Sequence, residues 1–254
     1  MKKIFLLVLL FPFFIFSAPS GSPSLPAIIE EGFFIPDTKW VNFRLGFLAY
    51  HALDLVMEFD EVGKDNNFHL RKVKANANLG VVTINIKDRL DLYAEIGSYK
   101  LEPEFRQGSS LYIAKSGNDI LYRAGARLIF FEILDFTLGA SVKYTIFSAS
   151  NDYLTINDRP VDSDIKFDFK EWQIDVGLAQ KISILRPYIG ISYRDTQIKM
   201  KNLPFLPDKL DLTFQKKAGV FLGVAASLGS FVMVEGEIKL VNERSTTLSL
   251  DVRF

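Results

Sequence analysis

The feature that most constrains this chain is a strict alternation of apolar and polar side chains, which recurs along most of its length. It is clearest over 136–146, where Phe, Leu, Ala, Val, Tyr and Ile occupy every second position between Thr, Gly, Ser and Lys. The same pattern runs through 41–47, 91–97, 172–178 and the last twenty residues. A period of two places successive side chains on opposite faces of a strand. The sequence therefore predicts an all-β protein whose strands have one apolar and one polar face.

Strand length and loop length favour a membrane barrel over a soluble sandwich. The predicted strands run to roughly 10 to 17 residues, whereas globular strands average about 5 to 6. Short connections are expected near 51–54, 87–89, 132–134, 182–185 and 229–230, and longer polar ones near 61–69, 106–117, 149–164 and 200–210. Short periplasmic turns that alternate with long outer loops are typical of outer-membrane barrels. We therefore expect a transmembrane antiparallel up-and-down β-barrel of the bacterial outer membrane, in contact with outer-membrane lipid.

The expected number of strands is about twelve, with ten as the alternative. Eleven candidate strands fall between Trp40 and Phe254, and bacterial barrels of this type have an even number. Ala27–Ile35 would supply a twelfth strand. If two candidates near Tyr50–Asp60 form one bent segment, the count is ten.

One uncharged window, Ala218–Val234, must be weighed as a transmembrane helix. It is at the lower length limit for a span. It contains several glycines, and Gly229-Ser230 is placed where a hairpin turn would be. We interpret it as two strands around a tight turn.

The first twenty residues are predicted to be a signal peptide. Lys2 and Lys3 precede an apolar run, and Ala18 and Ser20 are small residues at the −3 and −1 positions for cleavage before Gly21. The barrel is accordingly expected to span 21–254, in a protein exported to the bacterial outer membrane.

Composition excludes several function classes. The chain has 30 basic and 30 acidic residues, two histidines and no cysteine. A formal net charge of zero argues against nucleic-acid binding. The absence of cysteine excludes disulfides and thiolate metal sites. His51 and His69 match no catalytic motif, and no glycine-rich phosphate loop is present. We expect no enzymatic activity, no metal and no cofactor.

Charged residues on the polar faces of the predicted strands are expected to point inward and to line a pore. A lipid-facing charge at the membrane midplane would cost roughly 2–4 kcal/mol. The predicted pore-lining residues are Arg44, Asp91, Glu95, Arg123, Arg127, Lys143, Asp175, Arg186, Arg194, Glu235, Glu237, Lys239, Asp251 and Arg253. Both signs are present, which predicts weak ion selectivity for small solutes. The alternative is that these charges pair across a narrow lumen and fill it.

Aromatic residues near the predicted strand ends are expected to form interfacial girdles. They are Trp40, Tyr50, Phe130, Phe131, Phe147 and Phe254. Phe254 also ends an alternating strand at the C-terminus of the chain. This ending resembles the signal that the barrel-assembly machinery recognises.

Three segments resemble the chlamydial major outer membrane porin family. They are 19–32, beginning Pro-Ser-Gly-Ser-Pro-Ser; 78–97, with the Asp88-Arg89 turn between two strands; and 237–244, followed by a closing strand that ends Arg253-Phe254. The resemblance covers about a fifth of the chain. It implies a porin for general diffusion, a structural role in the envelope and a homotrimer. This chain is shorter than usual for the family and lacks its cysteines, so a disulfide-linked shell is not expected.

Two functions remain open on the sequence. The first is an outer-membrane porin that passes small hydrophilic solutes and ions. The second is a non-conducting structural or adhesin-like barrel that acts through its surface loops.

Overall fold

The computed structural model describes residues 20–27, 40–60, 68–204, 209–229 and 231–254. The predicted signal peptide therefore lies almost entirely outside the described residues. The first described element is a short 3-10 helix, η1 (Leu25–Ala27). The first seven strands are β1 (Val41–Leu55), β2 (Met57–Phe59), β3 (Phe68–Ile86), β4 (Leu90–Gln107), β5 (Ser110–Ser116), β6 (Asp119–Ile133) and β7 (Phe136–Ile156). The remaining seven are β8 (Arg159–Val161), β9 (Lys166–Gln180), β10 (Leu185–Lys201), β11 (Lys209–Phe214), β12 (Ala218–Leu228), β13 (Val232–Leu240) and β14 (Glu243–Arg253).

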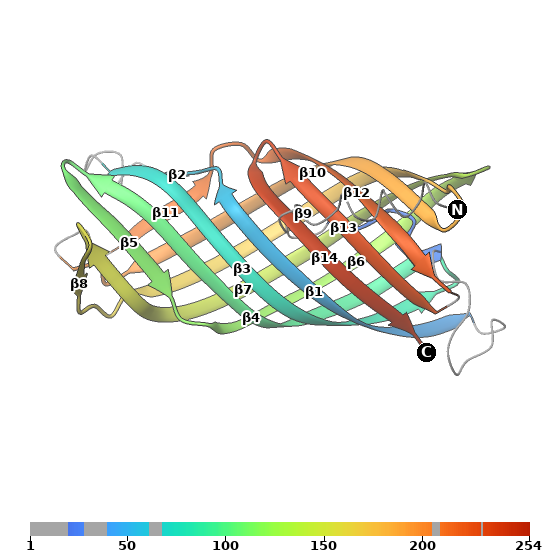
Figure 1. The fold of residues 1–254 in the computed structure, drawn as a ribbon, viewed down its shortest axis with the longest axis horizontal. Helices are drawn as coiled ribbons and strands as arrows, with labels where there is room; N and C mark the ends of the chain where they lie inside the picture. Colours follow the sequence, from blue (N-terminus) through green and yellow to red (C-terminus); the bar gives the residue numbers. More distant parts are fainter. Residues whose placement is uncertain (1–19, 28–39, 61–67, 205–208, 230) are drawn as a thin grey trace, which may run out of the picture.

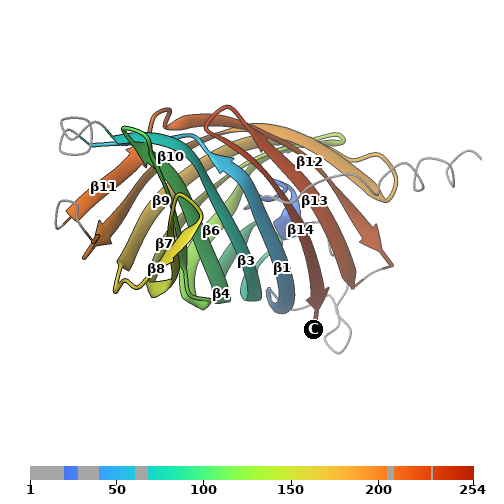
Figure 2. The same ribbon diagram turned by 60° about the vertical axis from the view of Figure 1, so that its left-hand side comes forward.

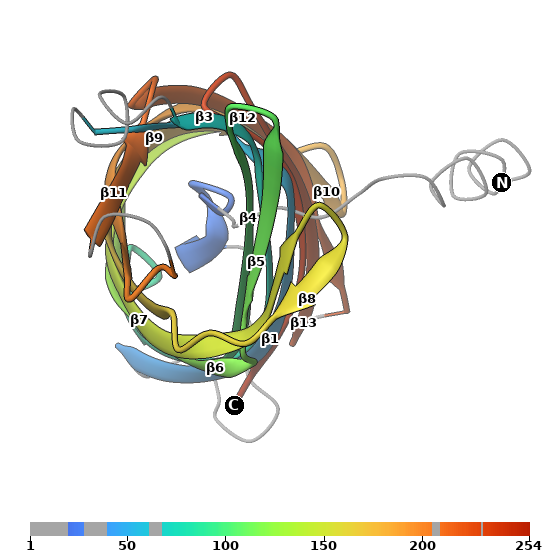
Figure 3. The same ribbon diagram turned by 90° about the vertical axis from the view of Figure 1, so that its left-hand side faces the viewer.

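The strands form one antiparallel sheet that closes on itself as a barrel (Figures 1 and 3). Sequential neighbours pair along the chain, and β14 pairs with β1. The ring closes because β12 pairs with β10 on one side and with β13 on the other. The closed ring has ten strands, so the expectation of a transmembrane up-and-down barrel is confirmed. The window 218–234 forms β12, a turn and the start of β13 rather than a helix.

The ring has ten strands rather than the preferred twelve, because several candidates are pieces of one strand. β5 and β6 both pair with β4 and with β7, and they are separated only by Gly117 and Asn118. β11 and β12 both pair with β10 and are likewise successive pieces. β2 continues β1 after a single residue. The expected twelfth strand at Ala27–Ile35 is not observed at Ala27, which ends η1, and 28–39 lie outside the described residues.

The barrel is narrower at one end than at the other. The β13–β14 hairpin turns at Val241 and Asn242, where the backbone N–H of Val56 donates to the carbonyl of Asn242 at 3.0 Å. Beyond this tip β11 pairs directly with β2. Beyond the tip β13 and β14 are absent from the wall, so the ring there has eight strands instead of ten. Figure 2 shows the hairpin ending well short of β3 and β4.

Some predicted connections are strands. The expected loop at 106–117 is the β4–β5 hairpin, and the loop at 149–164 contains the end of β7 and β8. The expected turn at 51–54 lies inside β1. The expected loops at 61–69 and 200–210 fall largely on 61–67 and 205–208, outside the described residues. Among the described residues, no helix is long and apolar enough to cross a membrane.

These connections were misassigned because the two faces of the wall exchange polarity at mid-height. On β4 the outward residues change from Leu92 and Ile96 to Lys100, Glu102 and Glu104. The inward residues change from charged to apolar at the same level. The exchange divides the barrel into a belt half (90–97 of β4, 136–146 of β7, 172–180 of β9) and an outer half (98–107, 147–156 and 166–171 of the same strands).

The interior of the outer half is a packed hydrophobic core. The ring of Phe105 lies 5.2 Å from that of Tyr112, 5.7 Å from that of Phe59 and 5.9 Å from that of Phe68, centroid to centroid. The rings of Tyr99 and Phe147 lie 4.8 Å apart. These side chains belong to one continuous cluster of buried residues that draws on almost every strand at this level.

The core also corrects two expected members of the aromatic girdles. Tyr50 and Phe147 are buried inside the outer half rather than placed at an interface, because both have the parity of the inward face. Trp40, Phe130 and Phe131 are exposed near the end that carries the short turns. Phe254 is half-buried, and its backbone N–H donates to the carbonyl of Phe43 at 2.9 Å.

Candidate functional site: the polar interior of the belt half

The structure places all fourteen predicted pore-lining residues on the interior face of the wall. Thirteen are buried, and Arg127 has a side chain that is 11% exposed. They face inward because the period of two holds through the belt half, so one buried face fixes the direction of every second side chain. Most of them form ion pairs or hydrogen bonds with other interior side chains or with residues 20–27.

Asp91 on β4 is the centre of the first cluster. Its carboxylate contacts the guanidinium of Arg44 and lies 3.7 Å from that of Arg127. The side-chain amide of Asn85 donates to it at 2.7 Å. Asp91 and Arg44 are almost completely buried, which requires this degree of pairing because an isolated charge there would be very costly.

Arg194 on β10 is the centre of the second cluster, at the boundary between the two halves. It forms a two-pronged ion pair with Glu243, at 2.9 and 3.0 Å, and its guanidinium lies 3.6 Å from Glu171. Lys239 approaches the same Glu243 carboxylate at 3.6 Å. On its other side Arg194 lies over the ring of Phe214, at 4.9 Å from the centroid. This layer joins the charged interior to the hydrophobic core.

Glu171 and Glu243 are interior residues that are absent from the predicted set, although the alternation in the sequence indicates both. Glu171 is four residues before Asp175 and shares its inward parity. Glu243 is eight residues before Asp251 on the same face of β14. Both were passed over because they stand at the ends of the clear alternation.

Two further interior cations, Arg123 and Arg253, are also paired with carboxylates. Arg123 donates to Glu95 at 2.7 Å and to the hydroxyl of Thr145 at 2.9 Å. Arg253 lies 3.1 Å from Asp88 in the turn between β3 and β4. Interior charges of opposite sign are therefore paired both between adjacent strands, such as β4 and β6, and between strands that are not adjacent, such as β10 and β14.

Residues 20–27 lie inside the barrel, and Figure 3 shows this segment within the ring. The backbone N–H groups of Ser20 and Gly21 donate to Glu237 at 2.6 and 2.9 Å. The backbone N–H of Ser22 donates to Glu235 at 2.5 Å. The hydroxyl of Ser20 donates to Asp175 at 2.9 Å. The start of the segment is thus held by carboxylates of β9 and β13.

The end of the same segment is held by cationic and amide side chains. Arg44 donates to the carbonyl of Leu25 at 2.8 Å, Asn85 to that of Pro26 at 3.0 Å and Arg186 to that of Ala27 at 3.4 Å. Side chains of acidic residues meet its N–H groups, and cationic or amide side chains meet its carbonyls. The segment therefore occupies the belt-half lumen with most of its backbone polar groups paired, as burial requires.

Tyr188 on β10 adds a hydroxyl to the acidic part of this site. It contacts Glu235 and donates to Glu237 at 3.1 Å. Its ring has room because the residue opposite it on β12 is Gly223, where a Cβ would overlap the ring. The glycine is therefore needed at this position for close packing.

The outer surface of the belt half is apolar and exposed. Large side chains on this surface include Phe43, Phe47, Ile96, Ile174 and Ile191. A band of this kind is unfavourable in water and suits the hydrocarbon of a bilayer. Every backbone group of a closed sheet is paired, so such a wall can cross a membrane.

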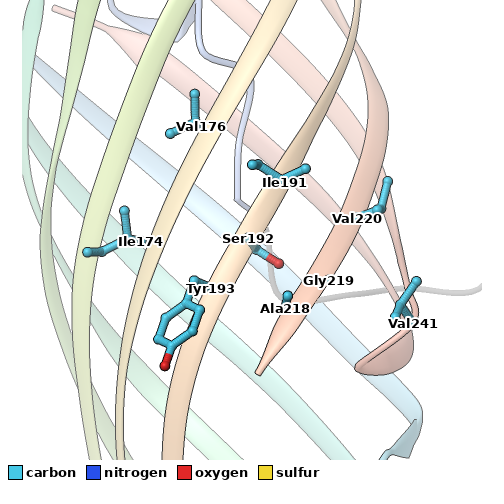
Figure 4. A pocket seen from close by; sticks show the side chains of 9 residues that line it. All are labelled: Ile174, Val176, Ile191, Ser192, Tyr193, Ala218, Gly219, Val220 and Val241. Atoms are coloured by element: carbon cyan, nitrogen blue, oxygen red, sulfur yellow. The ribbon is translucent and has the colours of Figure 1, made fainter. Parts of the chain in front are cut away.

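A shallow groove of about 390 Å³ crosses this apolar surface (Figure 4). It lies between β9, β10 and β12 and ends at the tip of the β13–β14 hairpin. Its lining is almost entirely apolar: Ile174, Val176, Ile191, Ser192, Tyr193, Ala218, Gly219, Val220 and Val241. A lining of this kind suits hydrocarbon better than water.

The outer surface of the outer half is charged. Ion pairs cross between neighbouring strands, as between Lys74 and Glu102 at 2.8 Å and between Lys201 and Asp168 at 2.6 Å. The hydrogen bond from Lys201 holds the pKa of Asp168 below its usual range. This surface is typical of a protein face in water.

No family model and no curated protein matches this chain. Its resemblance to the chlamydial porin family therefore stays a prediction. The chain is similar in structure to the outer membrane protease OmpT from Escherichia coli, with 9% identity and a TM-score of 0.43 over 84% of this chain and 96% of that one.

The transport unit of the autotransporter AIDA-I from Escherichia coli is similar with 11% identity and a TM-score of 0.42, over 92% of this chain and 98% of that one. The outer membrane protein OprG from Pseudomonas aeruginosa is similar with 10% identity and a TM-score of 0.39, over 84% and 96%. Likenesses at this identity concern the fold alone and say nothing about activity.

Proposed function

We propose that this chain is an integral outer-membrane barrel that does not conduct, with a structural or surface-recognition role carried by its outer half. The observation that supports this most strongly is the filled interior. Two different fillings lie in series along the barrel axis, and a solute would have to pass both.

The first filling is residues 20–27 together with the charge clusters of the belt half. Their hydrogen bonds run from Glu237 at one end of the segment to Arg186 at the other. The segment would have to break these bonds before water could form a continuous column. A barrel of ten strands is only slightly wider than one of about eight, which side chains alone fill.

The second filling is the hydrophobic core of the outer half. Here the ring has narrowed to eight strands, and aromatic rings from strands that are not adjacent in the wall pack together, as with Phe59 of β2 and Phe105 of β4 and with Tyr99 of β4 and Phe147 of β7. Phe105 and Leu101 are fully buried. A dry, close-packed interior has no room for hydrated ions.

The porin expected from the sequence is the second candidate. It is favoured by the charges of both signs inside the belt half, which would suit a weakly selective pore. For conduction the outer core would have to part and residues 20–27 would have to leave the lumen.

Planar-bilayer conductance of the refolded protein tests the proposal. Purified chain 21–254 should give no unitary steps above the lipid baseline at voltages where an established porin, reconstituted in parallel, conducts steadily. Steady ohmic steps from the unmodified protein would refute the non-conducting role and favour the porin.

A deletion of residues 21–27 locates the barrier. Because the outer core remains, we expect this shortened protein to stay closed. If it conducts while the full chain does not, the seal lies in the N-terminal segment alone, and our assignment of a barrier to the outer core is wrong.

The family relationship and the homotrimer that it implies also stay proposals. The oligomeric state can be measured by light scattering of the protein in detergent. A monomer would contradict the trimer without affecting the non-conducting role.

A further inference from the structure

Two carboxylates lie side by side in the part of the interior that holds the N-terminal segment. Glu235 and Glu237 are two residues apart on β13 and face inward, and both are 3% exposed or less. Like charges this close and this buried require strong donors around them. The structure supplies the hydroxyl of Tyr188 and the backbone N–H groups of Ser20, Gly21 and Ser22.

We propose that this carboxylate pair is the binding site for the chain's own processed N-terminus, the α-ammonium group of Gly21. The inference rests on the predicted cleavage before Gly21. Hydrolysis of the Ser20–Gly21 peptide bond consumes one water molecule. It leaves a carboxylate on Ser20 of the released leader and an amine on Gly21, which takes up a proton to become ammonium.

The position of the Gly21 nitrogen suits this role. It already lies 2.9 Å from Oε2 of Glu237, and the N–H of Ser20 lies 2.6 Å from Oε1 of the same carboxylate. After cleavage the Ser20 donor is gone, and the nitrogen of Gly21 has three N–H bonds instead of one. A hydrogen bond from a neutral N–H to a carboxylate becomes an ion pair between an ammonium group and that carboxylate, at a site buried from water.

Glycine suits this position in the uncleaved chain. Gly21 has a φ of +79°, in the left-handed region that favours glycine. A Cβ there would overlap the guanidinium of Arg127. Arg127 is a neighbouring positive charge, but its partner Asp91 lies 3.7 Å away. After cleavage the residue no longer has a φ, but its lack of a side chain still leaves the Arg127 guanidinium in place beside the nitrogen that faces Glu237.

Export and closure of the lumen are therefore linked through the backbone nitrogen of Gly21. Removal of the leader creates the charge that fastens the segment inside the barrel. The rest of the segment then remains in place through Arg44, Asn85 and Arg186.

The test combines the N-terminal group with a substitution. The mass of the protein extracted from outer membranes should begin at Gly21. Refolded chain 21–254 is then compared with its α-amine free or acetylated, as wild type and as Glu237→Gln. We expect acetylation to lower the folding equilibrium constant of the wild type about tenfold, and that of Glu237→Gln less than about twofold.

Glu95→Gln is the matched control, because Glu95 is also a buried interior carboxylate but is paired with Arg123. The tenfold effect of acetylation should persist in that variant. An equal effect of acetylation in wild type and Glu237→Gln would overturn the proposal, and so would an N-terminus other than Gly21.

A second measurement does not depend on the folding of a variant. In the folded wild type at neutral pH, the Gly21 amine should react with an acylating reagent at least about tenfold more slowly than in the unfolded chain, because the ammonium is buried and paired. Equal rates would overturn the proposal. Both tests measure how the N-terminal amine is bound and do not measure conductance. Their outcome is therefore independent of the outcome for the proposed function.

Discussion

Replacement of Phe105 by alanine tests whether the outer half is a packed core or a wet lumen. Phe105 is fully buried, and it is surrounded by the rings of Phe59, Phe68 and Tyr112 at 5.2 to 5.9 Å. In a dry core the substitution loses the transfer free energy of the ring and leaves a cavity that the fixed wall cannot close. In a water-filled pore, water would fill the space and the loss would be small.

The expected decrease in the free energy of unfolding is about 3–5 kcal/mol, the usual range for Phe→Ala in a close-packed interior. The upper part of this range applies here because aromatic pairs of this geometry add roughly 0.5–1.5 kcal/mol beyond their buried area. The measurement is urea-induced unfolding in lipid vesicles, followed by the fluorescence of the two tryptophans, Trp40 and Trp172.

Glu104→Ala is the control for this experiment. Glu104 is the neighbour of Phe105 on β4 but faces water, where its ion pair with Arg71 is exposed. Such pairs contribute about 0–1 kcal/mol. If Phe105→Ala costs no more than Glu104→Ala, the interior of the outer half is not a packed core. The proposed non-conducting role then loses its main support.

Three further predictions test the belt half and the hairpin tip by the same unfolding measurement. Arg194→Met should cost about 3–5 kcal/mol, because it leaves the buried carboxylate of Glu243 without its two-pronged partner; a loss below about 1 kcal/mol would mean that water reaches this cluster. Leu250→Arg, on the lipid face, should lower the free energy of unfolding by about 2–4 kcal/mol. Its control is Ser150→Arg, on the outward face beyond the belt, which should change that free energy by less than about 0.5 kcal/mol. Equal effects of the two substitutions would place the membrane boundary elsewhere. Val241→Gly should stabilise by about 1 kcal/mol, because Val241 has a φ of +85° that glycine adopts without strain; a destabilised variant would contradict the strain at the tip.

The alternation of side chains determined the fold class from sequence alone. It also fixed the inward direction of residues as far apart as Arg44 and Asp251, since one buried face sets the parity of a whole strand. These inferences needed only local periodicity, and a closed sheet in lipid is the arrangement that satisfies both faces and every backbone group.

The tertiary structure decided what the inward residues do. Whether the inward charges line water or meet one another depends on the width of the ring, and that width depends on strand pairing between segments distant in sequence. β11 and β12 share β10, and the β13–β14 hairpin stops partway, which no local pattern records. For the same reason, the sequence could not place Gly21 against Glu237, since 216 residues separate them along the chain.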